Sequence, residues 1–233
     1  MKPTVKVVNL TQYIHNQPVL NEVSFETVPG EMFVLFGPSG AGKTTLISIL
    51  AGIQTYTSGN VEVCDQRQIG LVTQEYSLFP QLTVKENLQI IGMMQGMASR
   101  NLMERFETIV ENFHLGNVLN RRAGRIPWGP RQRLALGCAM LSRPALLLVD
   151  DILHHGDIES TRIIVENVTE HVNQGHTCIW ATSRSPEALN LASTCQSRIG
   201  LLENQQLTTY QVEEFIQLLQ EHGVDQHWPG AGW

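Results

Sequence analysis

The sequence of 233 residues contains few charged side chains, and those of positive sign are the scarcer. Charged residues make up 16% of the chain, whereas about 25% is typical of soluble domains. The 16 lysines and arginines are outnumbered by 22 aspartates and glutamates, which leaves a net charge of −6. A nucleic-acid-binding domain needs a basic face, so this balance argues against a nucleic-acid partner.

Segments that would direct the chain into or across a membrane are also missing from the sequence. No stretch approaches the roughly 20 consecutive apolar residues that a membrane-spanning helix needs. The N-terminus lacks the basic-then-apolar pattern of a secretory signal peptide. The sequence therefore predicts a cytosolic chain.

Cysteine is scarce, and no two cysteines have the spacing of a metal or redox motif. Three of the four stand inside apolar runs, so buried free thiols are expected in place of a metal site. The four are Cys64, Cys138, Cys178 and Cys195.

One cationic cluster interrupts the acidic composition, and it could form a hidden basic patch. A solvated loop or a contact with another subunit is the favoured interpretation. Its members are Arg121, Arg122, Arg125, Arg131 and Arg133.

The most informative motif lies between an apolar strand and a helix. Residues 37–44 read Gly-Pro-Ser-Gly-Ala-Gly-Lys-Thr, the G-x-x-x-x-G-K-[ST] spacing of a phosphate-binding loop, with an apolar strand over 32–36 and an expected helix over 44–50. Such a turn directs backbone N–H groups and a helix N-terminus at one spot, which favours an anion. Lys43 supplies a positive charge for the β- and γ-phosphates, and the Thr44 hydroxyl can bind Mg²⁺. We therefore expect the chain to bind a nucleotide.

The remaining patterns predict how the chain is organised around this loop. Period-two alternation predicts antiparallel strands before the loop, at 5–9 and 19–28. Short apolar runs predict further strands after the loop, at 61–63 and 69–73. A helical period predicts an inserted helical segment over 77–143. Strand, helix and strand then alternate over 145–149, 158–172 and 177–181, before a last helix over 212–219. Such alternation is typical of a parallel sheet covered by helices. The expected fold is α/β: a P-loop NTPase core with a mixed or parallel sheet, an N-terminal antiparallel β subdomain and an inserted helical subdomain.

In their order and spacing these motifs resemble the ATP-binding subunit of ABC transporters over residues 1 to about 220. Residues 37–44 correspond to the Walker A loop, and residues 146–150 to the Walker B strand. Residues 131–136 correspond to the helix after the family signature. Gln74 corresponds to the glutamine of the Q-loop, although alone it could be a solvated polar residue at a strand end. Tyr13 corresponds to the aromatic that stacks on adenine, although alone it could be a packed surface aromatic.

The resemblance implies a set of site residues and two cofactors, ATP and Mg²⁺. It assigns nucleotide binding to Tyr13, Gly37, Pro38, Ser39, Gly40, Ala41, Gly42, Lys43, Thr44 and Thr45. It assigns Mg²⁺ to Thr44, Gln74 and Asp150, and catalysis to Gln74 and Asp151.

Several positions depart from the family pattern. The signature Leu-Ser-Gly-Gly-Gln corresponds to residues 126–130, where only Gly129 is retained. Trp128 adds bulk where backbone approaches phosphate in the family, and the prolines at 127 and 130 each remove a donor. Pro130 can still stand in the first turn of a helix, so the helix itself is expected to form.

Two further departures concern hydrolysis. The catalytic glutamate of the family corresponds to Asp151, whose carboxylate is one methylene shorter, and the switch histidine corresponds to Ser183. A general base must reach the attacking water, so slow hydrolysis is expected and enzymatic activity is left open. His154 or His155 could replace the missing imidazole, but an interface or solvent position is favoured.

The implied function is an ATP-binding subunit on the cytoplasmic face of a membrane, peripheral and bound to transmembrane permease subunits. Because its own motifs are degenerate, a hetero-pair with a second ABC ATPase subunit is favoured over a homodimer. The expected organisation is one domain over 1–221, with a helical subdomain at about 77–143 and a tail over 222–233. The competing class is a regulatory or scaffold protein that uses ATP as a structural ligand. A small-molecule P-loop kinase would share only the first loop.

Overall fold

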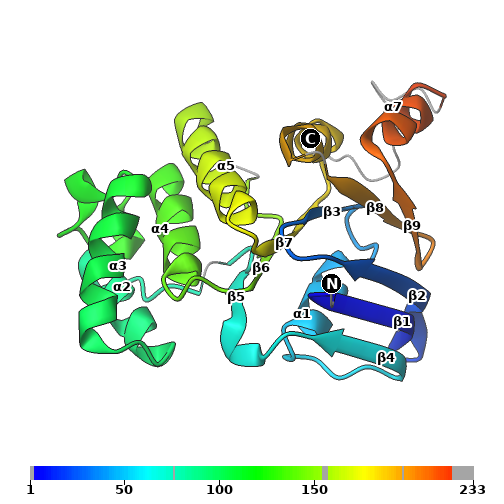
Figure 1. The fold of residues 1–233 in the computed structure, drawn as a ribbon, viewed down its shortest axis with the longest axis horizontal. Coiled ribbons are helices and arrows are strands. Elements are labelled where there is room, and N and C mark those ends of the chain that lie inside the picture. The colour runs from blue at the N-terminus through cyan, green and yellow to red at the C-terminus, as the bar shows by residue number, and fades with distance from the viewer. Residues whose placement is uncertain (1–2, 76, 154–156, 196, 222–233) are drawn as a thin grey trace.

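The computed structural model describes residues 3–75, 77–153, 157–195 and 197–221, and within them the chain forms two β-sheets and seven α-helices (Figure 1). The smaller sheet is antiparallel, with strand order β2-β1-β4. Its strands are β1 (Val5–Ile14), β2 (Gln17–Thr27) and β4 (Ser58–Val63). A tight turn at His15 and Asn16, both with positive φ, joins β1 to β2, as right-handed strand twist requires.

The larger sheet has six strands in the order β5-β6-β7-β3-β8-β9. Its first five strands pair in parallel, and β9 pairs antiparallel with β8. They are β5 (Ile69–Val72), β6 (Leu146–Asp150), β7 (Thr177–Thr182), β3 (Met32–Phe36), β8 (Arg198–Glu203) and β9 (Gln206–Tyr210). Strands β3, β6 and β7 are buried along their whole length, which explains their continuous apolar sequences.

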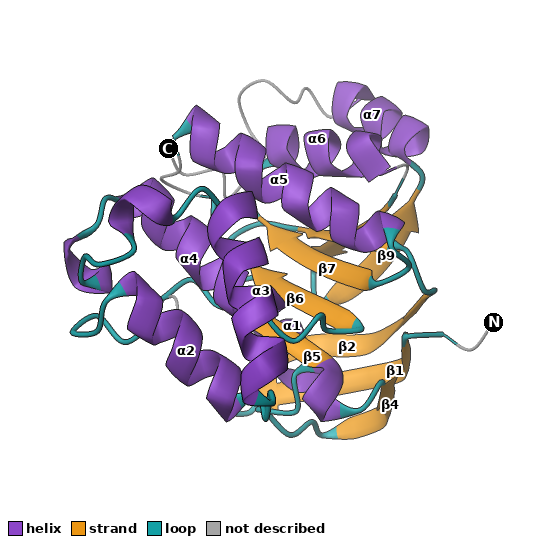
Figure 2. Ribbon diagram, turned by 60° about the vertical axis from the view of Figure 1, so that its left-hand side comes forward, coloured by secondary structure: helices purple, strands orange, loops and turns teal. Residues whose placement is uncertain are grey.

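The helices lie in two layers on either side of the larger sheet. Helix α1 (Lys43–Leu50) packs between the two sheets, where its apolar residues share a core with strands of both. The other helices contribute to the core on the opposite face (Figure 2). They are α2 (Val84–Met94), α3 (Ser99–Asn112), α4 (Trp128–Met140), α5 (Ile158–Asn173), α6 (Ser185–Cys195) and α7 (Val212–Glu221). Short 3-10 helices occur at Gln66–Gln68, Gly116–Val118 and Ala123–Arg125.

The expected helical segment between strands β5 and β6 contains α2, α3 and α4, which stand together at the left of Figure 1. Its first helix begins at a capping box: the Thr83 side chain accepts a hydrogen bond from the Glu86 backbone, and the Glu86 carboxylate accepts one from the Thr83 backbone. The fold class predicted from the sequence is confirmed. The sequence did not predict α6, β8 or β9, which follow the expected strand at 177–181.

Three smaller expectations can be compared with the structure. The cysteines are free thiols, two of them buried and two half-buried. Within the cationic cluster, Arg131 donates to three backbone carbonyls of residues 123–126, and Arg133 donates to the carbonyls of Phe113 and His114. These two arginines therefore stabilise loops inside the helical segment, while Arg121, Arg122 and Arg125 are exposed. Across the described residues, no helix is both long and apolar enough to span a bilayer.

Candidate nucleotide-binding site

Four predicted site segments meet at one edge of the larger sheet because they follow neighbouring parallel strands. The segment 37–44 follows β3, whose last residue Phe36 pairs with Thr182 at the end of β7. Asp150 ends β6 and pairs with Ala181 of β7. Val72 at the end of β5 pairs with Val149. The carboxyl edge of a parallel sheet is where ligands bind in open α/β folds.

The loop after β3 requires glycine at two positions because of backbone conformation. Gly40 has φ 81° and Gly42 has φ 105°, values that residues with a Cβ atom rarely adopt. A Cβ atom on Gly42 would also press against Val19 of β2. Gly42 is the N-cap of α1, and no side chain caps this helix. The first N–H groups of α1 thus remain available to an anion.

Lys43, the first residue of α1, is 6% exposed and reaches back into the loop. Its Nζ donates to the carbonyl oxygens of Gly37, at 2.7 Å, and Pro38, at 2.9 Å. Burial lowers the pKa of this ammonium, and the nearby charges of Asp151 and Asp150 oppose that shift. The side chain of Thr44 is exposed and that of Thr45 is half-buried.

Asp150 and Asp151, at the end of β6, are both buried. Lys43 lies close enough to interact with the charge of each. Asp151 has φ 50°, and its backbone N–H donates to the carbonyl of Ala181 at 2.9 Å. The hydroxyl of Ser183 donates to Asp151 Oδ2 at 3.0 Å. The structure thus brings together the two positions that the sequence analysis assigned to the family's glutamate and histidine.

Gln74 lies in an exposed turn two residues beyond Val72, at the same sheet edge as the aspartates. Its predicted role in Mg²⁺ binding and catalysis stays a prediction. His154 and His155 lie outside the described residues, and so does the expected tail over 222–233.

The segment that the sequence analysis assigned to the family signature, residues 126–130, lies at the start of α4. Pro127 is the N-cap and Pro130 stands in the first turn, so the helix forms as expected. Trp128 is 39% exposed. The retained Gly129 packs against the N-cap of α5, where a Cβ atom would overlap Asp157 Oδ2 and Ser160 Oγ. This contact gives a structural reason for glycine at 129 that does not involve a nucleotide.

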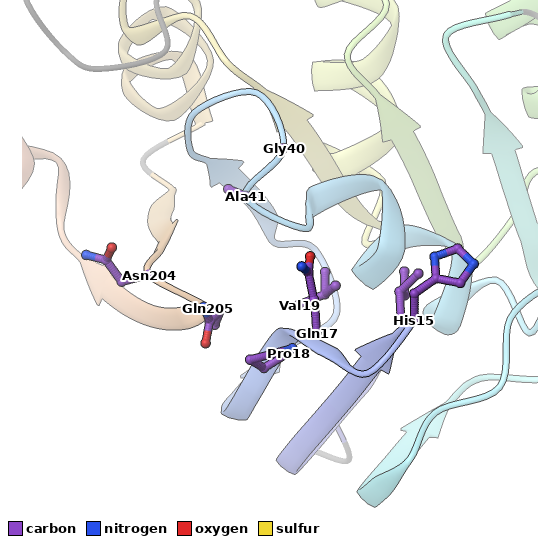
Figure 3. A pocket seen from close by; sticks show the side chains of 9 residues that line it. His15, Gln17, Pro18, Val19, Gly40, Ala41, Asn204 and Gln205 are labelled. Atoms are coloured by element: carbon purple, nitrogen blue, oxygen red, sulfur yellow. The ribbon is translucent and has the colours of Figure 1, made fainter.

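A cavity of about 380 Å³ opens beside the phosphate loop (Figure 3). Gly40 and Ala41 border one side of it, the turn between β1 and β2 a second, and the turn between β8 and β9 a third. Its lining consists of Ile14, His15, Gln17, Pro18, Val19, Gly40, Ala41, Asn204 and Gln205. Tyr13 is not among these residues; it is 47% exposed, and its backbone N–H donates to Thr57 Oγ1.

The residues at this edge match the chemical needs of a nucleoside triphosphate with Mg²⁺. Mg²⁺ is held in proteins by one or two carboxylates together with substrate phosphates and water. Asp150 and the exposed Thr44 hydroxyl are oxygen donors on adjoining segments, next to the ammonium of Lys43. Among the described residues, no group of three or more His, Cys, Asp or Glu side chains could hold a metal ion unaided.

The sequence analysis did not identify Glu187, nor Asn204 and Gln205, which line the cavity beside the phosphate loop. Burial, with the Asp151 charge adding to it, raises the pKa of Glu187 to about 7, while a 3.0 Å hydrogen bond from Trp180 Nε1 opposes the shift. No motif signals this residue, because its burial depends on how α6 packs on β7. Asn204 and Gln205 gave no signal either, since they lie about 160 residues from the loop and meet it only in the fold.

Comparison with known proteins identifies the family. The family model described as ABC transporter matches residues 20–154, and the chain belongs to that family. Members of this family bind ATP with Mg²⁺.

Several curated relatives are import ATP-binding proteins. The chain is 33% identical over 202 residues to the sulfate/thiosulfate import ATP-binding protein of Agrobacterium fabrum, covering 81% of this chain and 58% of the relative. It is 31% identical over 202 residues to the spermidine/putrescine import ATP-binding protein of Bacillus cereus, covering 82% and 62%. It is 30% identical over 199 residues to the maltose/maltodextrin import ATP-binding protein of Escherichia coli, covering 81% and 54%. The chain therefore spans a little over half the length of these relatives.

A solved structure titled as the ATP-binding subunit of an ABC transporter superposes with a TM-score of 0.82. It covers 96% of this chain at 22% sequence identity, which supports the fold.

Proposed function

We propose that this chain is the nucleotide-binding subunit of an ABC transporter and couples ATP binding to movement of transmembrane permease subunits. The observation that most supports it is the phosphate loop with buried Lys43 beside Asp150 and Asp151, at the carboxyl edge of a family fold. The curated relatives are named as import proteins, so import is the proposed direction. The proposed location is the cytoplasmic face of the membrane, through contact with the permease.

We further propose that the subunit works in an asymmetric pair with a second ABC ATPase subunit. In the family, each of two nucleotides lies between the Walker loops of one subunit and the signature of the other. Here Pro127 and Trp128 occupy the signature, and Asp151 and Ser183 the catalytic positions. Phosphoryl transfer relies on positioned donors and charges, so each change lowers the hydrolysis rate. The site with this chain's Walker face would hold ATP and turn it over slowly, whereas the partner's Walker face would supply most of the turnover.

The proposed organisation is a single domain over 1–221, with the helical subdomain at about 77–143 and the tail over 222–233. The shared core of α4, α5 and the larger sheet supports a single folding unit. The proposed nucleotide contacts are residues 37–45 with Tyr13 as the predicted adenine contact. Mg²⁺ is assigned to Thr44, Gln74 and Asp150.

The first test is purification of the tagged chain from gently solubilised native membranes, with identification of stoichiometric companions by mass spectrometry. Recovery with permease subunits and a second ATPase that has an intact signature supports the proposal. Recovery of the chain alone from the soluble fraction contradicts it and favours a regulatory protein that uses ATP as a structural ligand.

The second test separates these two functions through the phosphate loop. The Lys43→Ala variant removes the ammonium placed for the phosphates, and it is expected to abolish both ATP binding and uptake by the complex. Unchanged nucleotide binding and unchanged transport in this variant would rule out the proposed role of the loop.

A further inference from the structure

Glu187 lies behind the pair formed by Ser183 and Asp151, in a place that suits it to hold that pair in position; this inference rests on the proposed function. The pair is joined by the hydrogen bond from Ser183 Oγ to Asp151 Oδ2. Glu187 stands in the first turn of α6, which follows Ser183 directly in the chain fold. Burial raises the pKa of the Glu187 carboxyl, and the Asp151 charge adds to that shift, so the two carboxyl groups are near neighbours.

A side-chain hydrogen bond ties α6 to strand β7. The indole Nε1 of Trp180 donates to Glu187 Oε1 at 3.0 Å. The Trp180 ring is completely buried, and Glu187 Oε2 is shielded from solvent as well. Removing the acceptor would leave a buried indole N–H without a partner, which is costly inside a protein. The hydrogen bond therefore fixes the first turn of α6 against β7.

Ser183 depends on that attachment because very little chain separates it from α6. Strand β7 ends at Thr182, and only Ser183 and Arg184 lie between it and the start of the helix. The Arg184 backbone N–H donates to Thr182 Oγ1 at 3.1 Å, which closes this short connection. A shift of the first turn of α6 would therefore move the Ser183 hydroxyl away from Asp151.

Hydrolysis requires that the group activating the water is placed closely, and a misplacement of about 1 Å can cost about 100-fold in rate. In this chain Asp151 is the candidate base, and the Ser183 hydroxyl is a hydrogen-bond donor to it. We propose that Glu187 is a positioning residue for ATP hydrolysis: its hydrogen bond to Trp180 holds the start of α6, and the helix keeps Ser183 within reach of Asp151. Glu187 acts through these side chains and makes no contact of its own with the nucleotide.

Two substitutions of similar size separate this role from packing. Glu187→Leu keeps the bulk of the side chain and removes the acceptor, whereas Glu187→Gln keeps an acceptor for the Trp180 indole. Because burial raises the pKa of Glu187 to about 7, glutamine also mimics the neutral form that the native carboxyl adopts near neutral pH. Asn190→Leu, at an exposed position of the same helix, is the matched control and is expected to change neither measurement below.

The first measurement is hydrogen exchange of backbone amides in the purified chain, followed by NMR. The Arg184 amide and the Asp151 amide, both hydrogen-bonded to residues at the end of β7, report on the connection, and the Cys178 amide at the start of β7 is the reference. In Glu187→Leu the first two amides are expected to exchange at least about tenfold faster, while the Cys178 amide changes by less than about threefold. Equal acceleration of all three amides, or of none, overturns the inference.

The second measurement is a single-turnover assay with radiolabelled ATP and Mg²⁺, in which Lys43→Ala gives the background. Glu187→Leu is expected to hydrolyse ATP at least about tenfold more slowly than the native chain, with its Kd for ATP changed by less than about threefold. Glu187→Gln is expected to restore the rate to within about threefold of the native value. If Glu187→Leu does not fold, Trp180→Phe removes the same hydrogen bond from the donor side, and the same expectations apply.

Three results of this assay overturn the inference and leave ATP binding intact. They are an unchanged rate in Glu187→Leu, a rate that Glu187→Gln does not restore, and native turnover no higher than the Lys43→Ala background. Failure of the native chain to bind ATP is a different result, because it contradicts the proposed function itself.

Discussion

At the scale of single residues, the proposed site contains a hydrogen-bonded pair, Ser183 and Asp151, at the positions that we assign to the family's histidine and glutamate. The Ser183 hydroxyl donates to Asp151 Oδ2 and holds a carboxylate that is one methylene short of the family's base. A base must lie within about 3 Å of the water that it activates, so reach matters more here than basicity.

We therefore predict that the double variant Asp151→Glu with Ser183→His hydrolyses ATP at least about tenfold faster than the native chain, since positioned bases contribute factors of this size or larger. Phosphate release at saturating ATP and Mg²⁺ measures the rate. The same double variant carrying Lys43→Ala is the control, because turnover there would come from a contaminating ATPase. No gain over the native chain would mean that base length is not what limits hydrolysis.

Gly129 is the second residue whose role the structure makes specific. Its missing Cβ leaves room for the Asp157 carboxylate, which accepts hydrogen bonds from the backbone and hydroxyl of Ser160 and so caps α5. The Gly129→Ala variant is expected to lose about 1–3 kcal/mol of unfolding free energy through this overlap. Urea denaturation measures the loss. Gly116→Ala is the matched control, because a Cβ there meets no atom within 4 Å; an equal loss in both would show that the Asp157 contact is not the cause.

At the scale of elements, the C-terminal end of α5 packs a histidine pair against the turn before β6. The rings of His171 and His176 stack with centroids 4.3 Å apart, and His171 Nε2 lies 2.9 Å from the carbonyl oxygen of Pro144. Burial, with the charges of His176, Arg105 and Arg143 adding to it, lowers the pKa of His171 to about 4, while the Pro144 hydrogen bond opposes the shift. Burial also lowers the pKa of His176, with Arg143 adding to the effect.

Because the folded state lowers the pKa of His171 from 6.5 to about 4, it favours the neutral ring. The stabilisation is therefore full above pH 6.5 and is lost as the pH falls toward 4. At pH 5 the cost is on the order of 2 kcal/mol. We predict that His171→Gln, which keeps a side-chain donor for Pro144, reduces the stability difference between pH 7.5 and pH 5 in urea denaturation. The exposed His114→Gln is the control. An unchanged pH dependence in His171→Gln would show that this ring does not drive it.

At the scale of the whole molecule, the proposed asymmetric pair rests on the start of α4. The N-terminal segment of this helix contains Pro127 and Pro130, which lack N–H donors, and the partly exposed ring of Trp128. A nucleotide bound to a second copy of the chain would meet the Trp128 ring there and would find fewer backbone N–H donors. The molecule on its own is therefore expected to bind ATP without forming the closed pair that the family uses.

We predict that the native chain stays monomeric with ATP and Mg²⁺, and that the triple variant Pro127→Ser, Trp128→Gly and Pro130→Gln dimerises in an ATP-dependent way. Size-exclusion chromatography with light scattering measures the mass of each. The same variant with ADP is the control, since it lacks the γ-phosphate that the restored donors would contact. An ATP-dependent dimer of the native chain would contradict the asymmetric pair.

The sequence by itself determined the parts of this protein that are local. Gly40 and Gly42 specify a turn of positive φ, the apolar runs before Lys43 and Asp150 specify buried parallel strands, and short-range patterns of this kind are enough to give the fold class. The place of Pro130 in the first turn of α4 could also be predicted from the sequence, since the proline ring fixes its own φ angle at a value that suits a helix start.

Only the tertiary structure decided which residues share the site with the loop. Asn204 and Gln205 reach it because β8 pairs with β3, and this pairing depends on packing between segments far apart in the chain. Ile14 and His15 line the cavity whereas Tyr13 does not, and which residues at the end of β1 lie beside the loop follows from how the two sheets pack around α1. Local pattern sets the backbone of an element, but contacts between elements set what that element presents to a ligand.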